Sequence, residues 1–201
     1  MPIGLVRVVL LAAFMSAFGL VLHADPAEAQ TRQKAGGAVA SARPQTPMPD
    51  IPVRDQNGRR LSFYTDLVKD KTVAINFIFT TCTTICPSLT AAFRRVQEEL
   101  TERAPDVQLI SISVDPLTDT PERLRDFATR FKAGPGWTFV TGEKADIDSL
   151  LVGLGAATAS ASDHTPTILV SNDVTGYRTR ANGLSSPAAL VKIVTEAASR
   201  K

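Results

Sequence analysis

The segment TVAINFIFTTCTTICP, residues 72–87, joins an apolar run to two cysteines and a proline. Residues 72–79 are rich in β-branched and aromatic side chains, which is typical of a strand buried on both faces of a sheet. Residues 80–86 indicate a loop, and Pro87 fits the first turn of a helix, where a backbone N–H has no partner to lose. Because residues 88–102 have apolar side chains at helical spacing, the segment predicts strand, loop and helix, with both cysteines in the connection.

The rest of the chain continues this alternation of strands and helices. Such an order predicts an α/β protein with parallel strands joined by right-handed crossovers and a final antiparallel pair. We therefore expect a thioredoxin-like fold, with a central mixed sheet, an N-terminal hairpin and flanking helices. The other predicted elements are a hairpin with its turn at 56–58, strands at 107–114, 137–141, 167–171 and 177–181, and helices at 120–131, 145–154 and 187–199.

The N-terminal part has the composition of a targeting segment. Residues 8–22 are continuously apolar, and Ala27-Glu28-Ala29 has the small-x-small form of a cleavage site, which favours a signal peptide at 1–29. An uncleaved membrane anchor is the alternative, although the apolar stretch is shorter than a usual span. Residues 30–49 are rich in Ala, Gly, Gln and Pro and indicate a flexible linker, which leaves 50–201 as the folded domain.

Composition and charge limit the class of partner. Apolar residues make up 44% of the chain and charged residues 21%, with a net charge of +2, as in an ordinary globular protein. Lys and Arg are scattered, so we expect no nucleic-acid partner. The signal peptide predicts export to a bacterial periplasm, either soluble or anchored on that side, with membrane contact only through an uncleaved N-terminus.

The two cysteines, Cys82 and Cys86, are the strongest candidates for chemistry. They follow a buried strand, and functional groups in α/β sheets gather beyond the carboxyl ends of the strands. The positive end of the following helix favours the thiolate. A four-residue separation alone leaves three interpretations open: a structural disulfide, a redox pair, or a site for a soft metal.

His164 is the only histidine outside the predicted signal peptide. It precedes a Thr-Pro-Thr sequence that is similar to the thioredoxin loop whose cis-proline faces the active cysteines. If Pro166 takes that place, His164 lies close to the cysteine pair. Two thiolates and one imidazole suit Cu(I), and Cu(II) can add a fourth ligand. Structural zinc would require a fourth protein ligand.

Several motifs resemble the Sco/SenC family over roughly residues 48–185. The resemblance implies a thioredoxin-like fold with copper, Cu(I) or Cu(II), bound by Cys82, Cys86 and His164. It also implies delivery of copper to, or thiol maintenance of, the dinuclear copper site of cytochrome c oxidase. The matching motifs, in order, are the strand end at 76–82, Cys-x-x-x-Cys-Pro at 82–87, Ser113-Val114-Asp115-Pro116 with Asp119-Thr120-Pro121, and Asp163-His164.

Three acidic residues of these motifs are candidates for supporting roles. Asp115 follows the strand next to the cysteine-bearing one and is the first candidate for a fourth ligand. Asp163 is a candidate for orienting His164, whereas Asp119 is more simply a turn residue. The stretch 155–162 is short and made of small residues, unlike the longer tyrosine-containing stretch common in the family.

These features support a non-enzymatic copper chaperone. Copper would pass by ligand exchange to the copper-site subunit of cytochrome c oxidase or to another copper chaperone. A thioredoxin-like reductant would keep the cysteines reduced, because a disulfide abolishes Cu(I) binding. The alternative is a thiol–disulfide oxidoreductase acting on exported or copper-site cysteines with Cys82 and Cys86 as its redox pair. A peroxiredoxin-type peroxidase is a third and weaker hypothesis.

Overall fold

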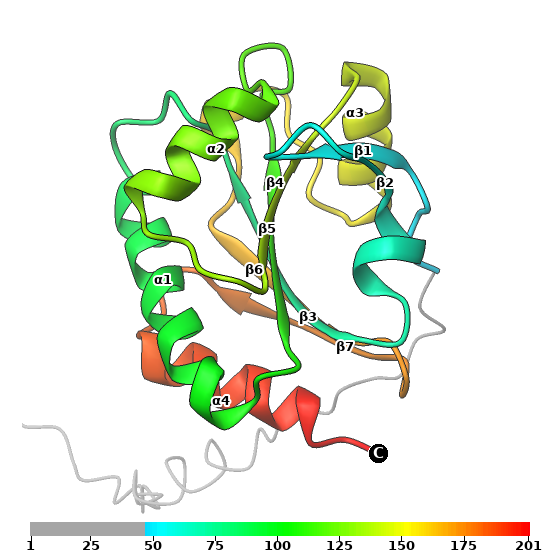
Figure 1. Cartoon of the computed structure of the whole chain (residues 1–201), viewed down its shortest axis with the longest axis vertical. Helices are drawn as coiled ribbons and strands as arrows, with labels where there is room; N and C mark the ends of the chain where they lie inside the picture. The colour runs from blue at the N-terminus through cyan, green and yellow to red at the C-terminus, as the bar shows by residue number, and fades with distance from the viewer. Residues whose placement is uncertain (1–46) are drawn as a thin grey trace, which may run out of the picture. The chain divides into compact units, whose positions relative to one another are not determined.

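The structure is a computed structural model that describes residues 47–201. A seven-stranded mixed sheet forms the centre of this part of the chain (Figure 1). The strand order is β2-β1-β5-β4-β3-β6-β7. Strands β3, β4 and β5 are parallel, while β6 pairs antiparallel with β3, β7 with β6, and β1 with both β5 and β2. The strands are β1 (Pro52–Asp55), β2 (Arg60–Ser62), β3 (Thr72–Ile78), β4 (Gln108–Ser113), β5 (Trp137–Thr141), β6 (Thr167–Asn172) and β7 (Tyr177–Asn182).

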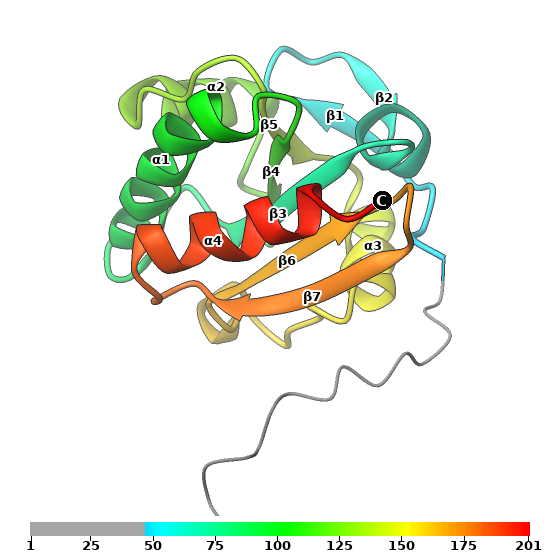
Figure 2. The same ribbon diagram turned by 90° about the horizontal axis from the view of Figure 1, so that it is seen from below.

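Helices cover both faces of this sheet. Helices α1, α2 and α4 lie together over one face, and α3 lies on the other, as Figure 2 shows from a second direction. A one-turn π-helix after β2 and a short 3-10 helix before β6 were not predicted. The helical elements are α1 (Cys86–Arg103), α2 (Pro121–Arg130), α3 (Lys144–Gly153), α4 (Pro187–Ala198), the π-helix Phe63–Val68 and the 3-10 helix Ala161–Asp163.

Strand β3 is buried on both faces, as its sequence predicts. Ala74 and Ile78 belong to the core under α1, α2 and α4. Val73, Ile75 and Phe77 belong to the second core, which α3 and the π-helix cover. Because alternate residues of a strand point to opposite faces, this run of apolar residues fills both cores at once. The end of β3 is therefore a rigid base for the cysteines that follow it.

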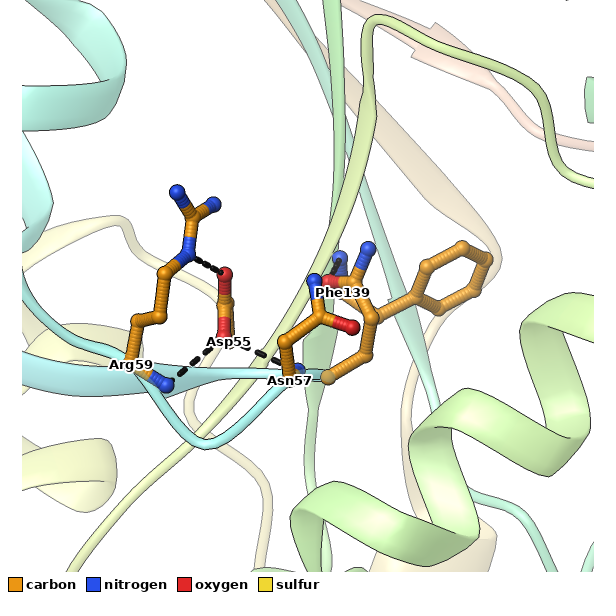
Figure 3. Close-up of polar contacts among 5 residues, drawn as sticks. Asp55, Asn57, Arg59 and Phe139 are labelled. Carbon is orange, nitrogen blue, oxygen red and sulfur yellow. Dashed lines mark hydrogen bonds and ion pairs between the residues drawn. The ribbon is translucent and has the colours of Figure 1, made fainter.

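The predicted hairpin is confirmed and is fixed to the sheet by polar contacts (Figure 3). Asp55 is fully buried and accepts hydrogen bonds from the N–H groups of Asn57 and Arg59, both at 2.9 Å. Its carboxylate also pairs with the Arg59 guanidinium at 2.6 Å. Gln56 accepts the N–H of Phe139 at 3.0 Å, which ties the turn to β5.

Some predictions at the edges of elements need correction. The helix predicted with Pro87 in its first turn begins at Cys86, the predicted end of the loop, so this cysteine also lies in the first turn. Among residues 47–201 the structure contains no cis peptide bond, so the bond before Pro166 is trans, unlike the cis-proline bond of the thioredoxin loop to which this sequence is similar. The carbonyl of Pro166 accepts the N–H of Gly183 at 2.6 Å.

The predicted signal peptide and most of the predicted linker lie outside the described residues, so both stay predictions. Within residues 47–201, no helix is long and apolar enough to cross a membrane.

Candidate functional site

The cysteine loop, residues 80–86, connects β3 to α1. Cys82 and Cys86 are both free thiols, and both are buried, with 8% and 0% of their surfaces exposed. The N–H of Cys82 donates to the carbonyl of Phe79 at 3.3 Å, which folds the loop back onto the strand end. The N–H of Cys86 donates to the Cys82 sulfur at 3.4 Å. The first turn of α1 therefore points a backbone donor at Cys82.

The two thiols differ strongly in acidity. Burial opposes ionisation of Cys82, but hydrogen bonds from the thiol and N–H of Cys86 and from Thr84 outweigh it and lower the pKa of Cys82 to about 7. Burial, together with the thiol's bond to the Cys82 sulfur, raises the pKa of Cys86 to about 12. At neutral pH the pair therefore holds one readily formed thiolate, on Cys82, which is the nucleophile and the first sulfur ligand available.

Asp119 fastens the start of the cysteine loop. It is fully buried and accepts the N–H of Thr80 at 3.1 and 3.2 Å and the Thr80 hydroxyl at 2.5 Å. The hydroxyl of Ser113, the last residue of β4, donates to it at 2.6 Å. Burial raises the pKa of Asp119, although these hydrogen bonds oppose that effect. Its charge also contributes to the raised pKa of Cys86.

The structure places the two loop aspartates in different surroundings. Asp115, the candidate fourth ligand, is half-buried, and its contacts are made by its main chain: its carbonyl accepts from Thr118 and Asp119, and its N–H donates to Ser113 at 3.0 Å. Asp119, expected to be a simple turn residue, is the buried group that anchors Thr80. Ser113, a small polar residue inside an apolar strand, is the sequence signal that points to a buried polar partner.

The histidine loop, residues 155–166, contains the third predicted ligand. The Nδ1 atom of His164 lies 2.9 Å from the carbonyl oxygen of Ala161. A carbonyl can only accept, so Nδ1 has the proton and Nε2 has a free lone pair. The Nε2 atom is buried and has no hydrogen-bond partner within the described part of the chain. An imidazole in this tautomer, with its second nitrogen unused, is ready to bind a metal.

Asp163 does not perform the orienting role proposed from its position. Its carboxylate accepts from the hydroxyls of Ser160 and Ser162, at 2.9 and 3.4 Å. The Ala161 carbonyl, at the start of the 3-10 helix, orients the imidazole instead.

Phe79 contacts both halves of the site. Its carbonyl accepts from Cys82, its N–H bonds to the Cys86 sulfur, and its ring lies edge-on to the His164 ring with centroids 5.6 Å apart. The imidazole packs on the ring without joining the sulfurs: among residues 47–201, no group of three or more His, Cys, Asp or Glu side chains is close enough to hold a metal ion. Binding by all three predicted ligands requires His164 and the thiols to come closer together.

The donor set fits a soft cation. The Cys82 thiol has a pKa near neutral pH, and the Cys86 thiol lies beside it. The Nε2 atom of His164, whose ring contacts Phe79, has no hydrogen-bond partner within the described residues. Thiolates with an imidazole select Cu(I) over hard cations such as Mg²⁺ or Ca²⁺.

Comparison with known sequences identifies the family of this chain. A sequence model of the SCO1/SenC family matches residues 51–199, which include the hairpin, both site loops and all of α4. The chain belongs to the SCO1/SenC family. The resemblance seen in the sequence motifs is thereby confirmed.

Individual relatives agree with this assignment. The SCO1/SenC chain is 38% identical to a SCO1 protein homolog of Bacillus subtilis over 90 residues, which is 44% of this chain and 46% of that protein. It spans about half the length of the curated relatives it matches.

Solved structures confirm the fold. BsSco, a member of the Sco family of cytochrome c oxidase assembly proteins in which a disulfide switch was identified, is 26% identical. It aligns with a TM-score of 0.64 over 78% of this chain and 98% of its own. Bradyrhizobium japonicum ScoI, solved with copper bound, is 24% identical and aligns with a TM-score of 0.61 over 73% of this chain and 96% of its own. The predicted α/β thioredoxin-like fold is therefore confirmed.

Proposed function

We propose that this SCO1/SenC protein is a copper chaperone that binds one Cu(I) through the sulfurs of Cys82 and Cys86 and the Nε2 of His164. The observation that supports it most directly is the buried Nε2 without a hydrogen-bond partner, on a ring that packs against the same Phe79 whose main chain contacts both cysteines. A buried polar atom without a partner is costly, and a metal ligand role accounts for its retention.

The difference in acidity between the two thiols sets the order in which they bind Cu(I). Cys82 is the more acidic and the more exposed thiol, so it meets the incoming ion first. Bound Cu(I) then displaces the proton of Cys86, because a coordinating thiol is deprotonated by the ion. Since Cys82 is about half ionised at pH 7, uptake of Cu(I) releases roughly one and a half protons per chain.

Copper is the cargo in this proposal, and release follows the same chemistry in reverse. A partner that presents its own thiolates replaces the ligands of this chain one at a time. The recipient we propose is the copper-site subunit of cytochrome c oxidase or another copper chaperone, in the bacterial periplasm. The family membership of BsSco, described as a cytochrome c oxidase assembly protein, supports that choice.

A second candidate function rests on the difference between the two thiols. In a thiol–disulfide oxidoreductase, the Cys82 thiolate would attack a substrate disulfide and Cys86 would resolve the mixed disulfide. A slightly exposed thiol of pKa about 7 beside a fully buried thiol of pKa about 12 is the arrangement that such a reaction uses. A thioredoxin-like reductant would serve both functions, since copper binding also needs the reduced pair.

An anaerobic titration of the reduced chain with Cu(I) against a competing chelator tests the proposal. We expect one copper per chain, and an affinity that falls by roughly 10–100-fold or more in His164→Ala. Weak binding that is indifferent to His164 would contradict the copper proposal. Turnover of a disulfide substrate that survives His164→Ala would then favour the oxidoreductase.

A further inference from the structure

Arg180, on the edge strand β7, contacts the start of the histidine loop. We propose that Arg180 is a positioning residue for His164: it fixes the point where the chain leaves α3, and so limits how far the loop that contains the imidazole can move. This inference rests on the proposed role of His164 as a copper ligand.

The contact caps the end of helix α3. The Nη2 atom of Arg180 donates to the carbonyl of Leu154 at 2.5 Å, and Leu154 is the C-terminal cap residue of α3. The last carbonyls of a helix have no intrahelical donor, and a cation there also interacts favourably with the helix dipole. Arg180 therefore supplies both a donor and a charge where α3 ends and the histidine loop begins.

Gly155 adapts the chain to this contact. Its φ of +62° is left-handed, and a Cβ at this position would lie 2.8 Å from the Nη2 of Arg180. The N–H of Gly155 donates to Val152 and that of Ala156 to Leu151, both near 2.9 Å, which is the Schellman pattern of a helix end. Gly155, the first residue of the histidine loop, has no Cβ, and this leaves the space that the Arg180 guanidinium needs to reach the end of α3.

The same strand also fixes the other end of the loop. Thr167, the first residue of β6, pairs with Asn182 of β7, and the carbonyl of Pro166 accepts the N–H of Gly183. Residues 180–183 thus hold both the entry and the exit of the histidine loop. The exit is held by main-chain bonds, which most substitutions leave in place, whereas the contact at the entry depends on the side chain of Arg180.

Arg180 and His164 also line one small cavity, of about 130 Å³, together with Phe77, Gly155 and Thr167. The guanidinium is part of the wall that the histidine loop packs against. Without Arg180 the Leu154 carbonyl loses its donor and the entry of the loop is freed. Ordering the imidazole at the copper then costs more conformational entropy, so affinity falls while the cysteine loop is unchanged.

Arg178 provides a matched control. It lies two residues away on β7, on the same face of the sheet, and it lines a neighbouring groove together with Arg180. It does not line the cavity that contains His164. Arg178→Ala therefore removes the same charge from the same strand while leaving the Leu154 cap in place.

The experiment compares Cu(I) affinity of the reduced full chain, its Arg180→Ala and Arg178→Ala variants, and Arg180→Ala combined with His164→Ala. We expect Arg180→Ala to weaken Cu(I) binding about 10-fold, Arg178→Ala to leave it unchanged, and Arg180→Lys to recover part of the loss. In the His164→Ala background, Arg180→Ala should have no further effect, because it acts through the imidazole. The pKa of Cys82, followed by alkylation rate, should be the same in all of these variants.

Two results would overturn the inference: equal losses in the Arg180→Ala and Arg178→Ala variants, or a loss from Arg180→Ala that persists without His164. Hydrogen exchange of the metal-free chain gives an answer that does not depend on copper. The amides of Ala156 and Asp163 should exchange faster in Arg180→Ala than in Arg178→Ala, and equal exchange would contradict the role of Arg180. If His164→Ala leaves copper binding intact while Arg180→Ala speeds this exchange, the proposed ligand set fails and the loop anchor stands.

Discussion

The cysteine loop and the histidine loop lie at the same site but are held in different ways. The cysteine loop begins on a strand buried on both faces and is tied down by the fully buried Asp119. The histidine loop is largely exposed, consists mostly of small residues, and is fixed at its two ends. The thiols are therefore preorganised, whereas the imidazole is positioned by a loop that can shift when copper arrives.

The largest effect we expect comes from the cysteine loop itself. Cys82→Ser and Cys86→Ser each remove one of the two proposed sulfur ligands, so Cu(I) affinity should fall by more than the roughly 10–100-fold typical of residues outside the ligand set. Competition with a Cu(I) chelator under anaerobic conditions measures it. A serine variant that still binds one copper tightly would show that the sulfurs are not both ligands.

The difference between the two thiols can be tested by pH. Because the thiolate is the nucleophile, alkylation of Cys82 should rise about tenfold per pH unit below pH 7 and level off above it. Cys86, with its pKa raised to about 12, should react only when the chain is unfolded. Mass spectrometry of the labelled peptides distinguishes the two residues. Equal labelling of both thiols in the folded chain would contradict the asymmetry.

Removing the buried anchor of the cysteine loop should cost stability. Asp119→Ala leaves the N–H of Thr80 and the hydroxyl of Ser113 without an acceptor, which should lower the free energy of unfolding by about 1–3 kcal/mol in urea at pH 7.

The shape-matched control for this variant is Asp119→Asn, which also tests the charge. The pKa of Asp119 is raised in the folded state, mainly by burial. A carboxyl of this kind contributes stability at low pH that is lost as the pH rises through its folded-state pKa. Asp119→Asn should lack this pH dependence. An unchanged pH profile in the Asn variant would show that another group titrates.

The smallest effect should come from the histidine loop's own carboxylate. Asp163 is exposed and bonds to serine hydroxyls, not to the imidazole. Asp163→Asn should therefore change stability by no more than about 0.5 kcal/mol and leave the Cu(I) affinity unaltered. A tenfold loss of affinity would return to Asp163 the orienting role that the structure gives to Ala161.

The sequence predicts the features of the two loops that depend on neighbouring residues, but it does not predict the contacts that hold the loops in place. The strand 72–79 and the cysteine positions follow from a continuous apolar run and from proline chemistry, which are local signals. The anchors are not local: Asp119 is 39 residues from Thr80, and Arg180 is 26 residues from Leu154. Their roles depend on which strands become neighbours, and that appears only in the folded sheet.

Two further features could not be predicted from the sequence, for local reasons. The π-helix Phe63–Val68 has no distinct sequence pattern, because its six residues contain too few turns for a periodicity to show. The Thr-Pro-Thr sequence alone does not set the isomer of the bond before Pro166, which is trans in the structure.

X-ray absorption at the copper edge of the Cu(I)-loaded, reduced chain tests directly whether two sulfurs and one imidazole bind the copper. We expect two sulfur ligands with the scattering pattern of one imidazole, and loss of that imidazole pattern in His164→Ala while both sulfurs remain. Copper bound by sulfur alone in the unmodified chain, or a spectrum that His164→Ala leaves unchanged, would contradict it.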